Sequence, residues 1–484
     1  MAGLKTLSKI SETVWELPPS YKPGMKVPAR FFATQNLIEQ MDQGVFDQIS
    51  NVAFLPGVEK YVCCMPDAHW GYGFPIGGVA AMRLEDGVIS PGGIGFDINC
   101  GMRLIRSNLT YEEVKPNLEN LVEALFARVP VGVGAKGLVR LDRSAFEKLL
   151  VEGAGWCVRK GYGEQDDLDR TEARGCIEGG DPYAVSNRAI DRGLAQIGTL
   201  GSGNHYLEIQ LLKKENIFDA NAASRMGLFP NQVVIMFHCG SRGFGHQVAS
   251  DYIEKFLGVM GPKYGLSVPD RELACAPFGS PEGQAYFAAM NCAINMSFAN
   301  RQMILHRIRE VFQTVLKKSP GDLGLRQVYD IAHNTAKIEE QNVDGRKKKL
   351  IIHRKGATRA YGPGFGELPG DFRDLGQPVI IGGSMETGSY LLVGTETSSQ
   401  AFYTTAHGAG RTMSRTKAKK LFRGSDLIAK MRRRGIYVRA ASMSGISEEA
   451  GDAYKNVDEV VESADKAQLT KKVARFVPIG NVKG

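Results

Sequence analysis

The sequence predicts an α+β fold with mixed β-sheets and surrounding helices. Segments with helical periodicity and short apolar runs of strand length are intermixed along the chain. They do not follow the strict strand–helix–strand alternation that is typical of Rossmann folds and TIM barrels. No internal repeat, low-complexity tract or Pro/Ser-rich linker divides the 484 residues. Length alone, at about 150 residues per domain, would suggest about three domains.

Three segments have the apolar spacing of amphipathic helices. Residues 117–127 carry apolar side chains at positions i, i+3, i+4 and i+7, from Leu118 to Leu125, which lie on one helix face. Residues 297–318 show the same spacing over a longer stretch, and Val457–Lys466 form a short acidic helix. Strands are predicted for the apolar runs at residues 232–237, 350–353, 378–381 and 390–393.

The composition describes a well-buried globular protein. Hydrophobic residues make up 43% of the chain and charged residues 23%, which excludes disorder over most of its length. No run approaches the roughly 20 apolar residues of a membrane-spanning helix, and the first 17 residues lack the apolar core of a signal peptide. We therefore expect a cytoplasmic protein without a membrane partner, whose eight cysteines are reduced.

Glycine is the compositional outlier, with 57 residues, and it concentrates in loops that also carry polar side chains. Such loops adopt positive φ and allow close backbone approach, as ligand-binding loops require. Four of them hold a histidine, a carboxylate or a cysteine directly beside an apolar run, and these residues are Asp97, Cys100, His205, His238 and His333.

A single histidine is more often structural than functional, and the Asp-x-x-Cys spacing of Asp97 and Cys100 is weak evidence alone. Four of the eight histidines, however, lie in such loops, with His407 as the fourth. This concentration favours one site that binds metal ions and phosphate. By softness, a thiolate with several imidazoles suits Zn²⁺ or Fe²⁺, so residue chemistry alone predicts zinc.

Further glycine-rich turns have the composition of phosphate-binding loops. A histidine beside such a loop serves as a general acid or base, or as a nucleophile at phosphorus, and His407 precedes Gly-Ala-Gly in this way. No P-loop motif occurs, and the G-x-G-x-x-G match at residues 132–137 has no helix after it. The basic residues near these turns are Arg242, Lys355, Arg411 and Arg415.

Positive charge also gathers in three runs, at residues 346–349, 415–423 and 430–434. The run at residues 346–349 is expected at the tip of a hairpin, where exposure to solvent is enough to explain its positive charge. The other two lie on helix-like segments after the His407 motif and favour a surface for a phosphate backbone. The net charge of +8 is modest and does not by itself establish a nucleic-acid partner.

Several long motifs together resemble the RtcB family of RNA-splicing ligases. They begin with MPDAHWGYGFPIGG at residues 65–78 and continue to the terminal Val-Lys-Gly, so the resemblance covers most of the chain. It implies a single large compact α+β unit over residues 1–484, in place of three domains. The other motifs are GGIGFDINCG, GSGNHYLEI, FHCGSRGFGHQVA, DIAHNTAK, HRKGATRA, GQPVIIGGSM and HGAGRTMSR.

The resemblance also implies roles for the residues singled out above. Two Mn²⁺ ions would be bridged by the Cys100 thiolate, with Asp97, His205, His238 and His333 as the other ligands. Mn²⁺ comes only from the resemblance, and tight zinc binding would inhibit. His407 would attack the α-phosphate of GTP to form a histidine–GMP intermediate. The implied GMP pocket comprises Asn204, His205, Tyr206, Leu207, Glu208, His333, Asn334, Gly382, Gly383, Ser384, Met385, Ser389, His407, Gly408, Ala409, Gly410 and Lys483. The implied RNA-phosphate cradle comprises Arg242, Lys355, Arg411 and Arg415.

The implied activity is GTP- and Mn²⁺-dependent joining of RNA 3′-phosphate or 2′,3′-cyclic phosphate ends to 5′-hydroxyl ends, as in tRNA splicing and RNA repair. The implied partners are RNA, such as tRNA halves, and an archease-like activator. Two alternatives stay open: an enzyme of the same family that caps 3′-phosphates with weak joining, and a non-catalytic RNA-binding module. The intact set of six residues from Asp97 to His407 argues against the module.

The chain departs from the family pattern at three points. Ala406 stands where the family usually has a cysteine, and Glu386 stands where glycine is usual. The loop from residue 396 to residue 407 is about one residue short. We expect Glu386 either to weaken triphosphate binding or to point to solvent.

Overall fold

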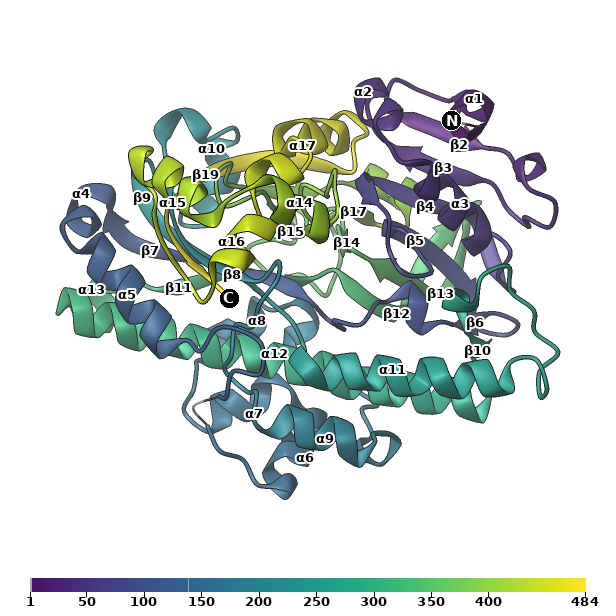
Figure 1. Ribbon diagram of the computed structural model, residues 1–484, viewed down its shortest axis with the longest axis horizontal. Helices are drawn as coiled ribbons and strands as arrows, with labels where there is room; N and C mark the ends of the chain where they lie inside the picture. The colour runs from purple at the N-terminus through teal and green to yellow at the C-terminus, as the bar shows by residue number, and fades with distance from the viewer. Residues whose placement is uncertain (1, 138) are drawn as a thin grey trace.

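Two large β-sheets with helices around them form the molecule (Figure 1). The computed structural model describes residues 2–137 and 139–484. Within these residues, no helix has both the length and the apolar character to cross a membrane. Most strand pairs are antiparallel, while β3–β4 and β18–β19 are parallel, so the sheets are mixed as predicted.

The first sheet contains seven strands and brings the N-terminal region together with a later hairpin. In this hairpin, β12 and β13 pair from Asn334↔Lys355 to Val343↔Arg346 around the turn at Asp344. The basic run at residues 346–349 therefore follows the hairpin tip, as expected. In spatial order the strands are β1 (Ser8–Lys9), β2 (Val14–Leu17), β3 (Ala29–Phe32), β4 (Val58–His69), β5 (Ile76–Arg83), β13 (Arg346–Lys355) and β12 (Asn334–Val343).

The second sheet contains eight strands and provides most of the loops with predicted ligands. In spatial order they are β11 (Arg326–Ala332), β7 (Gly101–Thr110), β9 (Gln232–Cys239), β8 (Tyr206–Leu212), β19 (Thr470–Lys483), β16 (Ser389–Gly394) and β15 (Pro378–Gly382), with β18 (Tyr437–Ala440) also paired to β19. The consecutive strands β11 and β12 belong to different sheets, and only His333 separates them. The two sheets are thus joined at a predicted metal ligand.

Two short ladders complete the sheet structure. β6 (Val88–Ile89) pairs with β10 (Ala276–Pro277), and β14 (Ala357–Arg359) pairs with β17 (Thr404–Ala406). The second ladder holds Ala406 opposite Ala357, and His407 follows it directly. Ala406, at the position of the family's usual cysteine, is completely buried and packs in the core.

Helices cover the sheets from several sides. The longest, α12 (Pro281–Leu316), runs beneath the sheets beside α11 (Arg242–Val259), as Figure 1 shows. The smaller helices around them are α5 (Leu118–Arg128), α6 (Arg143–Glu152), α7 (Ala154–Arg159), α8 (Gln165–Asp169) and α9 (Asn187–Leu194). The remaining helices are α1 (Ala2–Thr6), α2 (Gln35–Glu39), α3 (Gln43–Val52), α4 (Tyr111–Val114), α10 (Ala220–Arg225), α13 (Pro320–Leu323), α14 (Arg415–Leu421), α15 (Gly424–Arg433), α16 (Met443–Glu448) and α17 (Val457–Lys466).

All three predicted helices and all four predicted strands are present. α5 and α17 match their predicted ranges within one residue, while the segment predicted at residues 297–318 is the second half of the longer α12. One cluster of buried apolar residues includes side chains from Val14 to Leu469. His333 lies between β11 of one sheet and β12 of the other, and His407 directly follows β17.

Candidate active site

Five side chains predicted to bind metal form one continuous cluster. Sγ of Cys100 lies 3.3 Å from Nε2 of His205 and 3.0 Å from Nε2 of His238. Nε2 of His238 lies 3.0 Å from Nε2 of His333, and Nε2 of His205 lies 2.8 Å from a carboxylate oxygen of Asp97. The donor atoms of Cys100, His205 and His238 all lie within 4.8 Å of one another, and all three residues are buried. They form a candidate metal site.

The local backbone explains why these side chains converge. Cys100 directly precedes β7, and Asn99 before it has φ of 55°, a left-handed conformation that asparagine tolerates. His205 precedes β8, and His238 lies near the end of β9, which pairs with both β7 and β8. Gly240 lets the Asp97 carboxylate approach, since a Cβ at position 240 would lie 2.3 Å from its oxygen.

Hydrogen bonds on the far side of two imidazole rings fix which nitrogen faces the cluster. Nδ1 of His238 donates to the carbonyl of Asn204 at 3.1 Å, whereas Nδ1 of His205 lies 3.0 Å from the carbonyl of Leu200 and 2.8 Å from the guanidinium of Arg242. With the proton of His238 on Nδ1, its Nε2 directs a lone pair toward Cys100. Metal-binding histidines commonly have such a partner, so these residues fit a bound cation.

Burial affects the protonation of the same groups. It raises the pKa of the Cys100 thiol and lowers the pKa of the His205 imidazole, so both are neutral without a cation. Burial also opposes ionisation of Asp97, but His205 and Arg242 outweigh it and hold the Asp97 pKa below its ordinary value. A divalent cation would stabilise the thiolate of Cys100. These buried donor atoms are therefore better satisfied with a bound divalent cation than without one.

A fully buried cluster of Arg103, Arg301 and Asp330 packs against the backbone beside Cys100 and His238. Arg301 of α12 donates to the backbone carbonyls of Asn99 at 2.8 Å and Cys239 at 3.1 Å. Asp330 of β11 accepts hydrogen bonds from both Arg301 and Arg103. Arg301 thus contacts the neighbours of two predicted ligands, Cys100 and His238. The sequence offered no signal for it, because an arginine within an amphipathic helix is expected on the solvated face.

His407 is held by a buried carboxylate that the sequence analysis did not name. Nδ1 of His407 lies 2.6 Å from Oδ2 of Asp67, which also accepts the backbone N–H groups of His407 at 3.1 Å and Gly408 at 3.3 Å. Burial opposes ionisation of Asp67, yet these contacts with His407 lower its pKa. With its Nδ1 proton donated to Asp67, His407 presents the Nε2 lone pair. The signal for Asp67 was its place in the MPDAH motif, at the end of β4.

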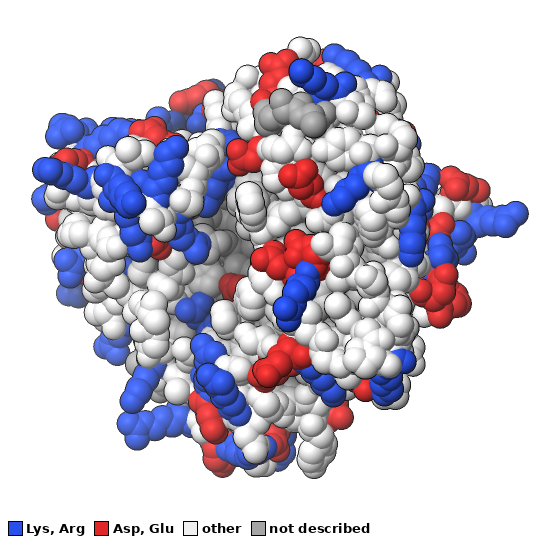
Figure 2. Space-filling model, turned by 45° about the vertical axis from the view of Figure 1, so that its right-hand side comes forward, with Lys and Arg blue, Asp and Glu red and all other residues white. Residues whose placement is uncertain are grey.

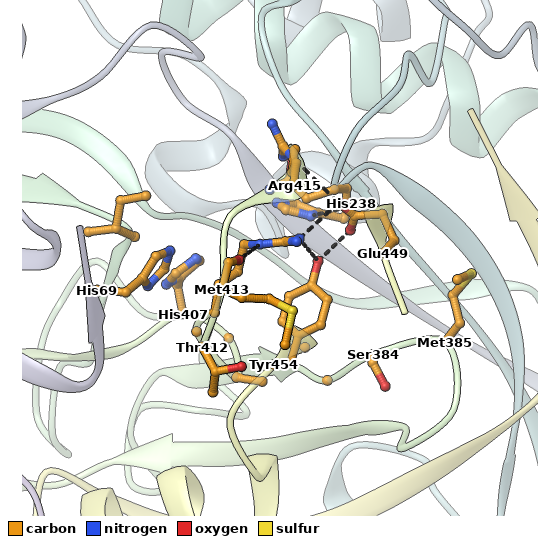
Figure 3. Close-up of a pocket in the computed structure, with 18 of the residues that line it drawn as sticks. His69, His238, Ser384, Met385, His407, Thr412, Met413, Arg415, Glu449 and Tyr454 are labelled. Atoms are coloured by element: carbon orange, nitrogen blue, oxygen red, sulfur yellow. Dashed lines mark hydrogen bonds and ion pairs between the residues drawn. The ribbon is translucent and has the colours of Figure 1, made fainter. Parts of the chain in front are cut away.

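A cavity of about 560 Å³ opens beside His407 (Figure 3). In Figure 3 His407 and His69 lie together at one end, while Ser384 and Met385 lie across the cavity. Predicted GMP-pocket residues form much of its wall. They are Asn204, Tyr206, Gly382, Gly383, Ser384, Met385, His407, Gly408, Ala409, Gly410 and Lys483.

Six predicted GMP-pocket residues do not line this cavity: His205, Leu207, Glu208, His333, Asn334 and Ser389. Leu207 packs in an apolar core cluster, because side chains along β8 alternate between the faces of the sheet. Burial raises the pKa of Glu208 to about 7. Ser389 lies behind the wall, where it accepts a hydrogen bond from Gln210 at 3.3 Å.

The far end of the cavity holds a cluster of cations around one carboxylate. Glu449 is buried and lies 3.2 Å from Arg411, 3.5 Å from Arg415 and 3.4 Å from Lys483. Its pKa is lowered because these cations outweigh the effect of burial, and the Tyr454 hydroxyl donates to it as well. Glu449 and Tyr454 were not predicted, since both lie in a segment that carries no recognisable motif.

The four predicted RNA-phosphate residues differ in exposure. The Arg415 side chain is 48% exposed and lines the cavity, whereas Arg411 is 14% exposed and is ion-paired with Glu449. Lys355 is buried and donates to the backbone carbonyls of Tyr72 and Gly92, and burial lowers its pKa to about 7. Arg242 lies 2.8 Å from Nδ1 of His205, behind the metal cluster. Of the four, Arg415 is the cation most accessible from the cavity.

Glu386 does not point to solvent, contrary to one of the two expectations. Its side chain is 6% exposed and pairs with Lys430 at 2.7 Å and Arg434 at 3.3 Å. Gly451 also donates to it, and it does not line the cavity. This carboxylate therefore ties the loop after β15 to the basic helix α15.

A family model and several known proteins similar to this chain are all described as RtcB ligases. The family model described as tRNA-splicing ligase RtcB matches residues 48–484. The tRNA-splicing ligase RtcB of Archaeoglobus fulgidus is 51% identical over 99% of both chains, and that of Thermococcus kodakarensis is 50% identical over 100% of both. The RNA-splicing ligase RtcB of Mycobacterium bovis is 48% identical over 90% of this chain and 100% of its own. This chain therefore belongs to the RtcB family.

Proposed function

We propose that this chain is a GTP- and Mn²⁺-dependent RNA ligase that joins 3′-phosphate or 2′,3′-cyclic phosphate ends to 5′-hydroxyl ends. One observation carries the proposal: His407, oriented by Asp67, faces a cavity bordered by the metal-site residue His238 and by cations. This arrangement provides a nucleophile, charge neutralisation for phosphate and space for a nucleotide. We also propose that residues 1–484 act as one unit, since the required side chains come from both sheets.

The proposed chemistry starts from the hydrogen bond between Nδ1 of His407 and Asp67, which leaves Nε2 with a free lone pair. Its Nε2 attacks the α-phosphorus of GTP, so that a P–N bond forms and pyrophosphate leaves. An oxygen of the RNA 3′-phosphate then attacks the same phosphorus, and the P–N bond breaks. The 5′-hydroxyl next attacks the 3′-phosphorus, releasing GMP and forming the 3′,5′ linkage. A 2′,3′-cyclic end must first be hydrolysed to a 3′-phosphate.

Metal and cations would assist these transfers by neutralising charge. Divalent cations held by Asp97, Cys100, His205, His238 and His333 would stabilise the charge that develops on phosphate oxygens. Family membership supports two Mn²⁺ ions, although the thiolate would also suit zinc. Arg415 lines the cavity and is half exposed, which supports a contact with the RNA phosphate, and the same role for Arg242, Lys355 and Arg411 stays a prediction.

The RNA itself would extend beyond the cavity over the basic helices α14 and α15. Figure 2 shows Lys and Arg side chains gathered on one side of a hollow in the surface. Lys417, Lys420 and Arg423 are exposed on and between these helices, directly after Arg415. The names of the relatives support tRNA halves as substrates. An archease-like activator and a cytoplasmic location are part of the same proposal.

The test is incubation with α-³²P-labelled GTP and Mn²⁺, followed by RNA with a 3′-phosphate and a separate 5′-hydroxyl strand. We expect labelled protein first, then labelled GMP on the RNA 3′ end, then joined RNA without label. Accumulation of capped RNA with little joining would favour the capping enzyme instead. Absence of labelled protein, together with RNA binding, would favour the non-catalytic module and contradict the proposal.

Replacing Asp67 by asparagine should slow labelling of the protein by about 10²- to 10⁴-fold. The amide can donate a hydrogen bond to Nδ1, which favours the proton on Nε2 and removes the attacking lone pair. The rate of acid-labile ³²P incorporation measures this effect, and the melting temperature serves as the folding control. Labelling at the wild-type rate would show that Asp67 does not orient His407.

A further inference from the structure

A buried carboxylate contacts the outer edge of β11 just before the chain crosses from one sheet to the other. β11 lies at the edge of its sheet, so backbone N–H groups on its far side need partners outside the sheet. The N–H of Asp330 donates to the carbonyl of Arg170 at 3.0 Å. The N–H of Ala332 donates to Oε2 of Glu172 at 2.9 Å. Glu172 thus holds the backbone at the residue directly before His333.

The other oxygen of Glu172 contacts the sheet on the far side of His333. Oε1 accepts a hydrogen bond at 2.6 Å from the ammonium of Lys337, which is a buried residue of β12. Arg359 of β14 lies 3.6 Å from the same oxygen. Burial opposes ionisation of Glu172, but these two cations outweigh it and lower its pKa to about 2. One charged carboxylate therefore bonds the strands on both sides of His333, one from each large sheet.

His333 connects the metal cluster with the proposed nucleophile. Its Nε2 lies 3.0 Å from Nε2 of His238, and its ring centroid lies 4.7 Å from that of His407. Its backbone N–H donates to the carbonyl of Cys100 at 2.9 Å, and its carbonyl accepts the N–H of Ala357 at 3.0 Å. Nδ1 of His333 is buried, and no atom of the described residues forms a hydrogen bond with it. The backbone around His333 therefore has the larger share in orienting its ring.

The turn that carries Glu172 has an uncommon backbone. Ala173 and Arg174 both have φ of 52°, and Gly175 has φ of 75°, so three successive residues are left-handed. Residues other than glycine rarely adopt this conformation, and they keep it only where the surrounding contacts impose it. Backbone strain of this kind clusters at functional sites. The turn over residues 172–175 is thus a specified feature of the fold, and its contacts with the crossover favour a role in the site.

We propose that Glu172 is a positioning residue for the metal ligand His333, acting through the Ala332 N–H and the Lys337 ammonium. By bonding both strands at the crossover, Glu172 keeps the His333 imidazole at a fixed distance from His238, so that both rings can bind one cation. This inference rests on the metal site of the proposed function. It extends that site to a residue that contacts none of the five predicted ligands directly.

A double-mutant cycle tests this role without requiring ligase activity. We expect Glu172→Ala to raise the Kd of the metal-free protein for Mn²⁺ at least about tenfold, the lower end of the range for outer partners of metal ligands. His333→Ala keeps Cys100, His205 and His238, so its Mn²⁺ affinity can be measured as well. In that variant, adding Glu172→Ala should change the Kd less than about twofold, because its effect passes through the missing imidazole. Isothermal titration calorimetry measures all four proteins.

A second cycle guards against loss of folding. Glu172→Ala alone would leave the buried Lys337 ammonium without its carboxylate, which is strongly destabilising. With Lys337→Met present in all four proteins, that unpaired charge is absent, and the same dependence on His333 should remain. Non-additive Kd values in this cycle would support the proposal even where Glu172→Ala alone does not fold.

Glu339→Gln is the matched control. Glu339 is a buried carboxylate of β12 that accepts a hydrogen bond at 2.8 Å from Arg354 of β13, so both partners belong to one sheet. This variant should lower the melting temperature yet leave the Kd for Mn²⁺ within about twofold of the wild type. A rise equal to that of Glu172→Ala would indicate a general loss of stability and overturn the proposal.

Three further outcomes are decisive. An unchanged Kd in Glu172→Ala would overturn the proposal, and so would an equal effect of Glu172→Ala with and without the His333 imidazole. Absence of Mn²⁺ binding by the wild type would overturn it together with the metal site. A wild type that binds Mn²⁺ but takes no label from GTP would refute the ligase activity, whereas the same titrations would still decide the role of Glu172.

Discussion

Replacing His407 by alanine is expected to abolish the formation of acid-labile, ³²P-labelled protein from α-labelled GTP. The reason is chemical, because alanine has no lone pair to attack phosphorus and water cannot hold GMP on the protein. Joining of RNA should stop as well, since each later step uses the GMP group first bound to Nε2. Gel autoradiography of the protein measures the first effect, and electrophoresis of the RNA measures the second.

A matched control is available on α12. His306 is half-buried and pairs with Glu310 outside the cavity, so His306→Ala should label like the wild type. Residual acid-labile label in the His407 variant would assign the nucleophile to another residue. An RNA strand supplied already capped with GMP at its 3′ end should still be joined by the His407 variant, because that step no longer requires Nε2.

Among single replacements of the predicted metal ligands, Cys100→Ala is expected to lower the affinity for Mn²⁺ most. Cys100 contributes the only sulfur of the cluster and contacts both His205 and His238. Loss of even an outer hydrogen-bond partner costs about 10- to 100-fold in metal affinity, so loss of a ligand should cost at least about 100-fold. Metal analysis after dialysis against defined Mn²⁺ concentrations measures this, without any need for activity.

The control for this change is Cys176→Ser, at a partly exposed cysteine far from the cluster in sequence. It should bind as much Mn²⁺ as the wild type. The Cys100 variant should retain the fold, because Cys100 is a small side chain at the end of a strand, and its circular dichroism spectrum tests this. Metal content equal to that of the wild type would show that the thiolate is not a ligand.

The sequence alone predicted the local elements and the membership of the cluster well. Helical periodicity located α5 and α17, because apolar side chains face the core every three to four residues. Polar residues beside glycine-rich strand ends identified Cys100, His205 and His238, which the structure brings together. Such loops are recognisable because a site needs both unusual backbone conformations and reactive side chains in a short stretch.

The contacts between distant segments could not be predicted in this way. Asp67 and His407 are 340 positions apart, and no local pattern indicates that one orients the other. Nothing in the sequence around Glu449 indicates a site, and its contacts with Arg411 and Lys483 are formed only by the fold. Lys355 was predicted to contact an RNA phosphate, yet its ammonium group is buried and donates to a backbone carbonyl.

The chain passes from one sheet to the other through His333, which is a predicted metal ligand. A small rotation of one sheet against the other would shift the His333 imidazole relative to His238, whose Nε2 atoms are 3.0 Å apart. A cation bound by both His238 and His333 would therefore restrict the rotation of one sheet against the other.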